Sequence, residues 1–230
     1  MRLMRTPKKI DIDITNRCNL RCRYCYHYES AGDAGSDLPA SEWLRFFEEL
    51  GRCAVTEVTM AGGEPFIRED LKEIIGGIVR NRMRFQILSN GTLIDDDMAD
   101  FLVSTKRCNY VQVSIDGSMP ESHDAMRGRG SFAKAMQGLM TLRRRGVPTA
   151  VRVTIHRKNV RDLEGIEAGL ADSVRLIADE VRGSVREAMK SLRADLAAAA
   201  QTDQGAAKAR TSAEDAARAD ERADARAQAR

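Results

Sequence analysis

A repeated succession of strand-like and helix-like segments constrains the fold of this 230-residue chain more than any other feature. Short stretches in which polar and apolar residues alternate predict strands, and apolar residues at helical spacing lie between them. We expect strands near 10–14, 55–60, 85–88, 111–115 and 150–155, and helices near 38–50, 68–83, 95–105 and 131–145, the last with Ser131 as its N-cap. Alternating elements imply right-handed parallel crossovers, which build either a barrel or an open sheet.

The polar residues on these strands favour a barrel. Strands covered by helices on both faces read as continuous apolar runs. Here polar residues recur at alternate positions instead: Asp11, Asp13, Thr15, Glu57, Thr59, Gln112, Ser114, Arg152 and Thr154. Helices must cover the apolar face, so the polar face lines an interior that is open enough to hold a ligand. We therefore expect fold class α/β, with the chemistry in the loops at the carboxyl ends of the strands.

Three cysteines lie close together directly after the first expected strand. Cys18, Cys22 and Cys25 are separated by three and then two residues, so their thiolates can converge on separate irons of one [4Fe-4S] cluster. One iron is then left without a protein ligand, and S-adenosylmethionine can chelate it through its amine and carboxylate. The alternatives are a zinc site with His27 as the fourth ligand, a disulfide, or accidental clustering.

A glycine-rich segment, Gly62-Gly63-Glu64-Pro65, follows the second expected strand. Its glycines let the backbone turn sharply and approach a ligand, and Glu64 places a carboxylate at the same point. An ordinary turn is the alternative, because these residue types are common in turns. The position directly after a strand, about forty residues beyond the cysteines, favours a binding loop.

Two further loops at strand ends carry candidate contacts. Ser89 and Asn90 follow the third expected strand, while Ser114 and Asp116 close the fourth, where a side chain could reach a ribose hydroxyl or a substrate. Turn chemistry is the alternative for both loops. A lone histidine on a polar segment, His123, is interpreted as structural or solvated.

The cysteine loop, with Tyr24 before its third cysteine, resembles the signature loop of the radical SAM superfamily, and Gly62–Pro65 resembles the segment that holds the amino group of S-adenosylmethionine there. The resemblance covers roughly residues 8–162 and leans towards the SPASM-type peptide-modifying enzymes, the peptide maturases. Their C-terminal cysteine-rich extension is not matched, because the last cysteine is Cys108. The resemblance implies a partial, here incomplete, (β/α)6 TIM-like barrel.

The same resemblance implies how the candidate residues work together. The cluster ligands would be Cys18, Cys22 and Cys25; contacts to S-adenosylmethionine would come from Tyr24, Gly62, Gly63, Glu64, Pro65, Ser89, Asn90, Ser114 and Asp116. No residue is assigned a catalytic role of its own. Because Cys53 and Cys108 lie in or beside expected helices, where cysteine behaves as a small apolar residue, we expect a single cluster.

The implied activity is reductive cleavage of S-adenosylmethionine to a 5′-deoxyadenosyl radical, which would modify a peptide or protein substrate. An electron donor of the flavodoxin or ferredoxin type is then needed. Two alternatives stay open: a cofactor-biosynthesis radical SAM enzyme of the GTP cyclase type, and a non-catalytic, truncated iron-sulfur or scaffold protein.

The C-terminal third departs from the resemblance. Apolar residues from Ile166 to Leu196 recur with an eleven-residue period, which describes one long helix, 163–196, rather than a barrel crossover. The tail 197–230 holds alanine with charged and small polar residues and cannot bury itself. We expect three parts, a radical SAM core at 1–162, the helix and the tail. Two explanations of this segment stay open. It is either a genuine helix that self-associates or binds a partner through 163–196, or the product of a truncation or a shifted reading frame.

Composition adds little about partners. A net charge of +3 from 37 basic and 34 acidic residues favours no nucleic-acid partner. No run of about eighteen apolar residues could span a bilayer, and the basic arm 1–9 lacks the apolar region of a secretion signal. We expect a cytoplasmic protein without membrane contacts.

Overall fold

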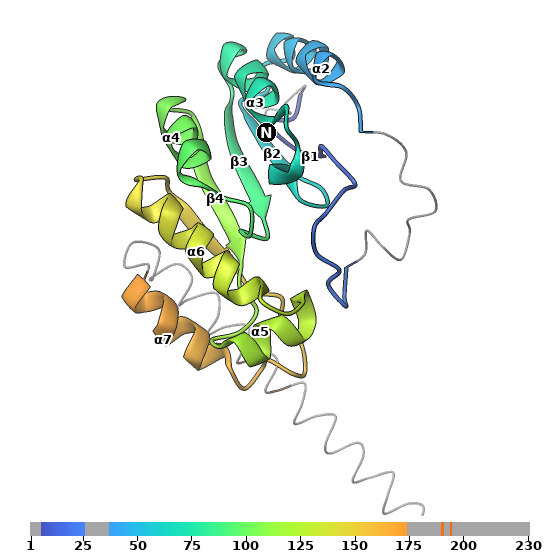
Figure 1. Ribbon diagram of the computed structural model, residues 1–230. Coiled ribbons are helices and arrows are strands. Elements are labelled where there is room, and N and C mark those ends of the chain that lie inside the picture. The colour runs from blue at the N-terminus through green and yellow to red at the C-terminus, as the bar shows by residue number, and fades with distance from the viewer. Residues whose placement is uncertain (1–5, 26–36, 174–189, 191–193, 195–230) are drawn as a thin grey trace, which may run out of the picture. The chain divides into compact units, whose positions relative to one another are not determined.

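The computed structural model describes residues 6–25, 37–173, 190 and 194, and contains a parallel five-stranded sheet in the order β1-β2-β3-β4-β5. The strands are β1 (Lys9–Asp13), β2 (Glu57–Ala61), β3 (Arg84–Ser89), β4 (Cys108–Ser114) and β5 (Thr149–Arg152). The helices are α2 (Ala40–Arg52), the 3-10 helix η1 (Pro65–Ile67), α3 (Leu71–Arg80), α4 (Asp96–Ser104), α5 (Pro120–Arg127), α6 (Ser131–Arg144) and α7 (Leu163–Ser173). Strand order follows chain order, so neighbouring strands are joined by parallel crossovers (Figure 1).

This architecture confirms the expected α/β class and the partial barrel. Each strand and helix expected before residue 150 is present within a few residues of its predicted bounds. The sequence pattern does not predict α5, because this eight-residue helix is largely polar. In the part of the chain that the structure describes, no strand follows β5.

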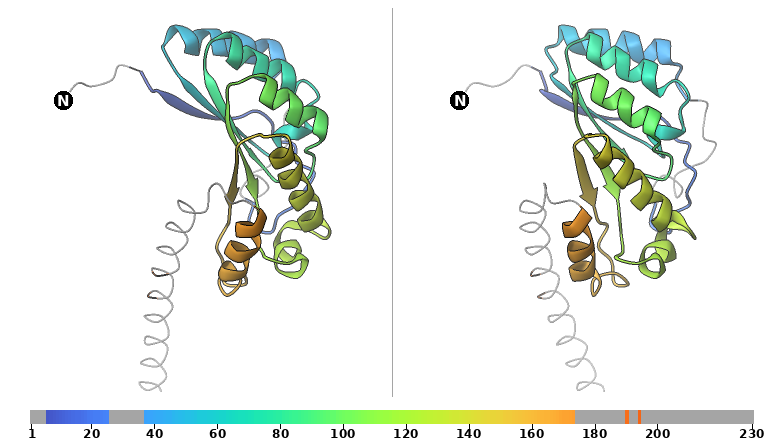
Figure 2. Two further views of the ribbon diagram at one scale, coloured as in Figure 1. Left: turned by 90° about the vertical axis from the view of Figure 1, so that its left-hand side faces the viewer. Right: turned by 60° about the vertical axis from the view of Figure 1, so that its left-hand side comes forward.

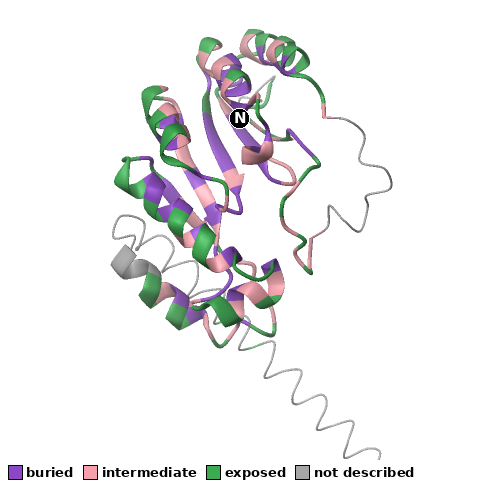
Figure 3. Cartoon of the chain, viewed as in Figure 1, coloured by how far each residue is buried: buried purple, intermediate pink, exposed green. Residues whose placement is uncertain are grey.

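Alternate side chains of the central strands form the hydrophobic core. The wholly buried members are Val58, Met60, Phe85, Ile87, Val111 and Val113. They face α2, α3, α4 and α6, which lie together on one face of the sheet (Figure 2), and the buried residues gather along this contact (Figure 3). Complete burial of such a side chain contributes roughly 1.5–3 kcal/mol. This single helix-covered face is therefore the main source of stability.

The opposite face of the sheet is polar, as the alternation predicts. Asp11 and Asp13 of β1 are exposed. Gln86 of β3 donates a hydrogen bond to Thr59 of β2 at 2.9 Å, and Asn109 of β4 donates one to the Gln86 side-chain oxygen at 3.2 Å. Polar side chains on this face therefore satisfy one another across three strands.

Asp124 of α5 caps α6, so the prediction of Ser131 as the N-cap is wrong. The Asp124 carboxylate accepts hydrogen bonds from Gly130 N at 2.6 Å, Phe132 N at 2.8 Å and the Ser131 hydroxyl at 3.1 Å. Ser131 is instead the first helical residue and is buried, behind a left-handed Gly130. An acidic group from outside the helix can complement its N-terminal dipole, which no local sequence pattern predicts.

The chain divides into two compact units, residues 1–178 and 179–230. Helix α7 belongs to the first unit, where Leu163 and Ile166 are buried. Of the second unit only Lys190 and Ala194 are described, both helical and exposed. Most of the expected long helix and the whole tail 197–230 lie outside the described residues, so the boundary at residue 162 stays a prediction. No helix of the described part combines the length and apolar character that a bilayer crossing requires.

Gly138 of α6 tests how tightly this helix packs on the strand ends. A β-carbon at position 138 would overlap the Gly91 carbonyl that follows β3. We expect Gly138→Ala to destabilise the apoprotein by about 1–3 kcal/mol through overpacking, despite the better helix propensity of alanine. Urea unfolding measures the change. Gly169→Ala on α7, where nothing lies within 4 Å of the added carbon, is the matched control and should not destabilise. Equal stability of the two variants would contradict the packing.

Candidate functional site

The three cysteines of the loop after β1 line one cavity at the carboxyl edge of the sheet. The cavity has a volume of about 370 Å³, and Cys18, Cys22 and Cys25 all border it. Each of these cysteines is outside any disulfide and is partly buried. Burial raises the pKa of the Cys22 thiol, the Arg127 guanidinium opposes this, and the neighbouring Cys18 and Cys25 thiols raise it further. The Cys22 sulfur is therefore close enough to the Cys18 and Cys25 sulfurs to interact with them electrostatically.

The donor set of three cysteines is compatible with a cluster. Within the described residues, no three histidine, cysteine, aspartate or glutamate side chains could hold one metal ion together. A cubane instead takes its thiolates on separate irons, which is compatible with three sulfurs that share a cavity without meeting at a point. The zinc alternative required His27, which lies outside the described residues.

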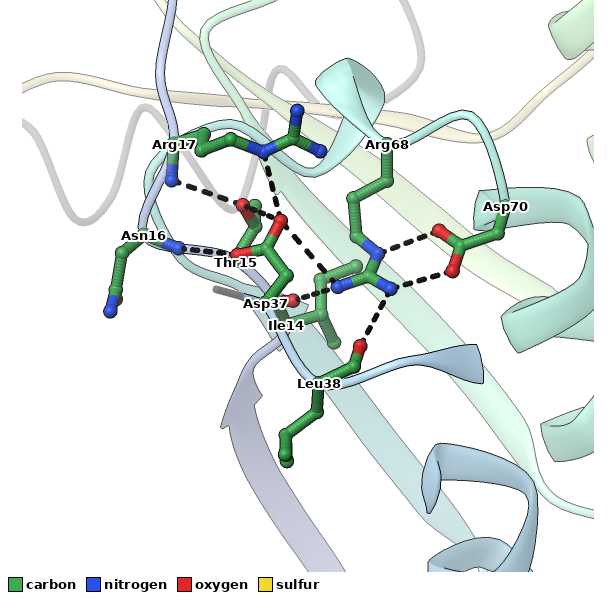
Figure 4. Close-up of polar contacts among 8 residues, drawn as sticks. All are labelled: Ile14, Thr15, Asn16, Arg17, Asp37, Leu38, Arg68 and Asp70. Atoms are coloured by element: carbon green, nitrogen blue, oxygen red, sulfur yellow. Dashed lines mark hydrogen bonds and ion pairs between the residues drawn. The ribbon is translucent and has the colours of Figure 1, made fainter. Parts of the chain in front are cut away.

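Asp37 closes the cysteine loop at its base (Figure 4). Its carboxylate accepts hydrogen bonds from the Thr15 hydroxyl at 2.9 Å, Asn16 N at 3.4 Å and Arg17 Nε at 2.9 Å. The Thr15 hydroxyl accepts in turn from Arg17 N at 3.0 Å. The residues that lead into Cys18 are thus held by a side chain from the far side of the loop.

Arg68 anchors the same point from inside the protein. Its guanidinium, whose side chain is 3% exposed, donates to the Ile14 carbonyl at 2.7 Å and the Leu38 carbonyl at 2.9 Å (Figure 4). The Asp70 carboxylate receives both Nε and Nη2, at 2.8 and 2.7 Å. This pairing lowers the pKa of Asp70. Both ends of the loop that carries the cysteines are therefore tied to one buried cation.

Gly62 and Gly63 are needed because two backbone segments meet there. Gly63 N donates to the Thr15 carbonyl and Glu64 N to the Arg17 carbonyl, each at 2.8 Å. A β-carbon on Gly62 would overlap the Thr15 carbonyl, and one on Gly63 would overlap the Arg17 carbonyl. Gly62 also has a φ of 132°, a value that side chains disfavour. The glycines therefore allow a close approach to the cysteine loop itself, as well as bordering the cavity.

Glu64 joins this loop to the one after β3. Its carboxylate is fully buried and accepts hydrogen bonds from the Ser89 hydroxyl at 2.8 Å, Asn90 N at 2.7 Å and Phe66 N at 3.2 Å. Burial raises the pKa of Glu64 from its ordinary 4.5 to about 7, although the three donors oppose the shift. The buried Glu64 side chain thus fixes the position of the loop after β3.

Asp116 links the segments that follow β4 and β5 in the same way. It is fully buried, accepts from Thr154 N at 2.8 Å and Arg127 Nε at 2.6 Å, and receives the Tyr24 hydroxyl on the same oxygen as Arg127. The Arg127 guanidinium lies over the Tyr24 ring, 5.6 Å from its centroid. Burial raises the pKa of Tyr24 above its ordinary value. Tyr24 of the cysteine loop after β1 is therefore fixed to the residue Asp116 that follows β4.

His123 is structural, in agreement with its interpretation from the sequence. It is fully buried and its Nδ1 accepts a hydrogen bond from Asp116 N at 3.1 Å. Burial lowers its pKa to about 4, so the imidazole is neutral at physiological pH. The ring packs edge-on against Phe132, with centroids 5.5 Å apart.

The cavity brings together most of the residues singled out from the sequence. Its lining includes the predicted Cys18, Cys22, Tyr24, Cys25, Gly62, Gly63, Ser89, Asn90 and Ser114. Glu64, Pro65 and Asp116 lie outside this lining, so a direct ligand contact by them stays a prediction. The lining residues not singled out as site residues are Leu20, Ala61, Leu88, Gln112, Arg127, Arg152 and Thr154. Of these, Gln112, Arg152 and Thr154 could have been found, because the polar alternation of the strands points them inward.

The two remaining cysteines lie apart from the cavity lining. Cys53 is exposed and follows the last residue of α2. Cys108 opens β4, which corrects the expectation that it lies in or beside a helix. It is buried, and burial raises the pKa of its thiol to about 12, so it stays protonated.

Parallel strands with a cysteine-lined cavity at their carboxyl edge define a class of α/β proteins that hold a cofactor in the mouth of a partial barrel. The family model described as "Radical SAM superfamily" matches residues 12–168, and the chain belongs to this superfamily. Members of the superfamily use a [4Fe-4S] cluster and S-adenosylmethionine, as the sequence resemblance implied.

The chain is also similar to individual proteins. It is 36% identical to Fe-coproporphyrin III synthase of Methanosarcina barkeri, over 67% of this chain and 38% of the relative. It is 29% identical to PqqA peptide cyclase of Granulibacter bethesdensis, over 71% of this chain and 44% of the relative. The solved structure of native anSMEcpe with bound AdoMet shares the fold, with a TM-score of 0.64 and 20% identity over 73% of this chain and 49% of that one. The chain therefore spans about two fifths of the length of the two curated relatives.

Arg68→Met tests the anchor beneath the cysteine loop. The change leaves the Ile14 and Leu38 carbonyls and the partly exposed Asp70 carboxylate without their donor, and a buried acceptor left unsatisfied costs about 1–3 kcal/mol. Urea unfolding of the apoprotein should show a loss of this size. Arg45→Met, which removes an exposed arginine on α2, is the control and should change stability little. A loss below about 1 kcal/mol for Arg68→Met, within the range of an exposed pair, would contradict the anchor.

The raised pKa of the buried Glu64 carboxyl predicts that the stability of the protein depends on pH. Its pKa is higher in the folded state, so its contribution is fully present below about pH 4.5 and is lost as the pH rises towards 7. We expect the wild type to become more stable relative to Glu64→Gln when the pH falls from 7.5 to 4.5, by roughly 3 kcal/mol for such a shift. Urea unfolding at both pH values measures it. The exposed Glu73→Gln is the control, and a pH-independent difference for Glu64→Gln would contradict the buried carboxyl.

Proposed function

We propose that this chain binds a [4Fe-4S] cluster through Cys18, Cys22 and Cys25, and S-adenosylmethionine in the adjoining cavity, for a radical modification of a peptide or protein. The observation that carries the proposal is the shared lining: three thiols, two close-packed glycines and polar strand ends border one volume of about 370 Å³. Three thiols on one loop fit a cubane with an open iron. When bound, the two cofactors supply a reductively generated carbon radical that removes a hydrogen atom from substrate.

The protein residues around the cavity hold and shield these groups. Arg127 lowers the cost of ionising Cys22, and thiolates are the form that ligates iron. The backbone at Gly62 and Gly63 borders the cavity without a side chain, which leaves space for the methionyl part of S-adenosylmethionine. Tyr24, fixed by Asp116, presents its ring to the same volume. Ser89, Asn90 and Ser114 offer polar groups for the remaining contacts.

A peptide substrate is supported by the similarity to PqqA peptide cyclase. The second candidate is a tetrapyrrole substrate, which is favoured by the 36% identity to Fe-coproporphyrin III synthase. In either case, a low-potential electron donor of the flavodoxin or ferredoxin type would reduce the cluster, and a cytoplasmic location would keep the thiols reduced. Self-association through 163–196 is part of the proposal for the C-terminal helix.

Anaerobic reconstitution tests the proposed function. The protein with iron, sulfide, dithionite and S-adenosylmethionine should produce 5′-deoxyadenosine, measured by liquid chromatography, and should hold about four irons per chain, the content of one cluster. Alanine at Cys18, Cys22 or Cys25 should abolish both cluster and product, because each thiolate holds a different iron. Cys53→Ala is the matched control and should change neither.

The other outcomes separate the alternatives. A fully loaded cluster without 5′-deoxyadenosine would favour the non-catalytic protein. Close to eight irons per chain, the content of two clusters, would contradict the single site. Incubation with a precursor peptide in one arm and an iron coproporphyrin in another separates the two substrate classes, since only the correct one should be altered in mass.

A further inference from the structure

We propose that Asn90 is a positioning residue that donates a hydrogen bond to the Cys18 sulfur and thereby raises the reduction potential of the cluster. This rests on the proposed function, in which Cys18 is a cluster ligand. Asn90 Nδ2 lies 3.7 Å from Cys18 Sγ and 2.9 Å from Asn19 Oδ1, so its two amide hydrogens have separate acceptors. The side chain comes from the β3 loop and reaches across to the loop after β1.

The orientation of the Asn90 amide follows from its neighbours. Its oxygen accepts hydrogen bonds from Thr92 N at 2.9 Å and from the Thr92 hydroxyl at 2.7 Å. An amide turned the other way would place its NH2 group against the Thr92 N–H, a donor against a donor. The oxygen is therefore directed to Thr92, and the nitrogen is directed to the sulfur.

The backbone of Asn90 is equally constrained. Asn90 N donates to the buried Glu64 carboxylate at 2.7 Å, and the Ser89 hydroxyl accepts from Gly91 N at 2.8 Å. Asn90 itself is 7% exposed. Asn19 Nδ2 donates to the Thr92 hydroxyl at 2.8 Å, which completes a closed set of side-chain hydrogen bonds between the two loops. The donor is therefore presented to Cys18 by a rigid frame.

The electrostatic consequence concerns the reduced cluster. Reduction adds one electron from dithionite or the donor protein, breaks no bond and increases the negative charge on the sulfurs. A hydrogen bond to a ligand sulfur stabilises the more negative state, which raises the potential. Leu20 N donates to the same sulfur at 3.4 Å, so Cys18 receives two such bonds. Removing the Asn90 donor should therefore lower the potential, while the thiolates and iron stay in place.

Redox titration of the reconstituted protein without S-adenosylmethionine, followed by electron paramagnetic resonance, tests this inference. Asn90→Asp replaces the donor by an acceptor of the same shape and should shift the potential to a more negative value. Asn90→Ser retains a shorter donor and should give a smaller negative shift. Asn109→Asp on β4, whose amide contacts Gln86 and not a cysteine, introduces the same change away from the cluster and should leave the potential unchanged.

The outcomes decide between tuning and a purely structural role. Wild-type potentials in both fully loaded Asn90 variants would overturn the inference. Variants that fold, by circular dichroism, yet lose their iron would overturn it too, because Asn90 would then be needed for assembly. A wild-type protein that takes up no cluster would overturn the proposed function as well, and that result is distinguishable because it appears before any substitution is made.

Discussion

The structure depends on one close approach, the meeting of the glycine loop after β2 with the cysteine loop after β1. Two backbone hydrogen bonds of 2.8 Å join Gly63 to Thr15 and Glu64 to Arg17. No β-carbon fits at Gly62 or Gly63. This contact fixes the residue directly before Cys18, so the position of the first thiol follows from glycine sterics. Arg68 then satisfies the Ile14 and Leu38 carbonyls at the base of the same loop.

Buried ionisable side chains extend this arrangement across the carboxyl edge of the sheet. Arg68 serves the base of the cysteine loop, Glu64 holds the loop after β3, and Asp116 joins the end of β4 to Thr154 beyond β5 and to Tyr24. Each has multiple partners, which offsets the cost of burying a charge. The helix-covered face of the sheet supplies most of the hydrophobic stability, while these three groups set the positions of the loops around the cavity.

Membership of the radical SAM superfamily agrees with this division of roles. The matched region, residues 12–168, covers the five strands almost entirely and ends within α7. The two curated relatives are more than twice as long as the part that matches, so more than half of each lies outside the aligned region. Asn90 Nδ2 donates to the Cys18 sulfur inside this matched region, at the cavity that the three cysteines border.

The sequence by itself determined the order of the strands and of every helix before residue 150 except α5 and the short η1, as well as the polar inner face and the grouping of Cys18, Cys22, Cys25, Gly62 and Gly63 at one edge. Periodicity and the turn chemistry of strand ends are local properties. Only the tertiary structure decided what the buried polar groups do. The carboxylates of Glu64 and Asp116, whose contact with a ligand stays a prediction, accept hydrogen bonds from Asn90, Arg127 and Thr154. Asp124 rather than Ser131 caps α6. Such partners lie far along the chain or on another element, so no local pattern specifies them; they are selected when the fold removes each charge from water and a hydrogen bond must replace it.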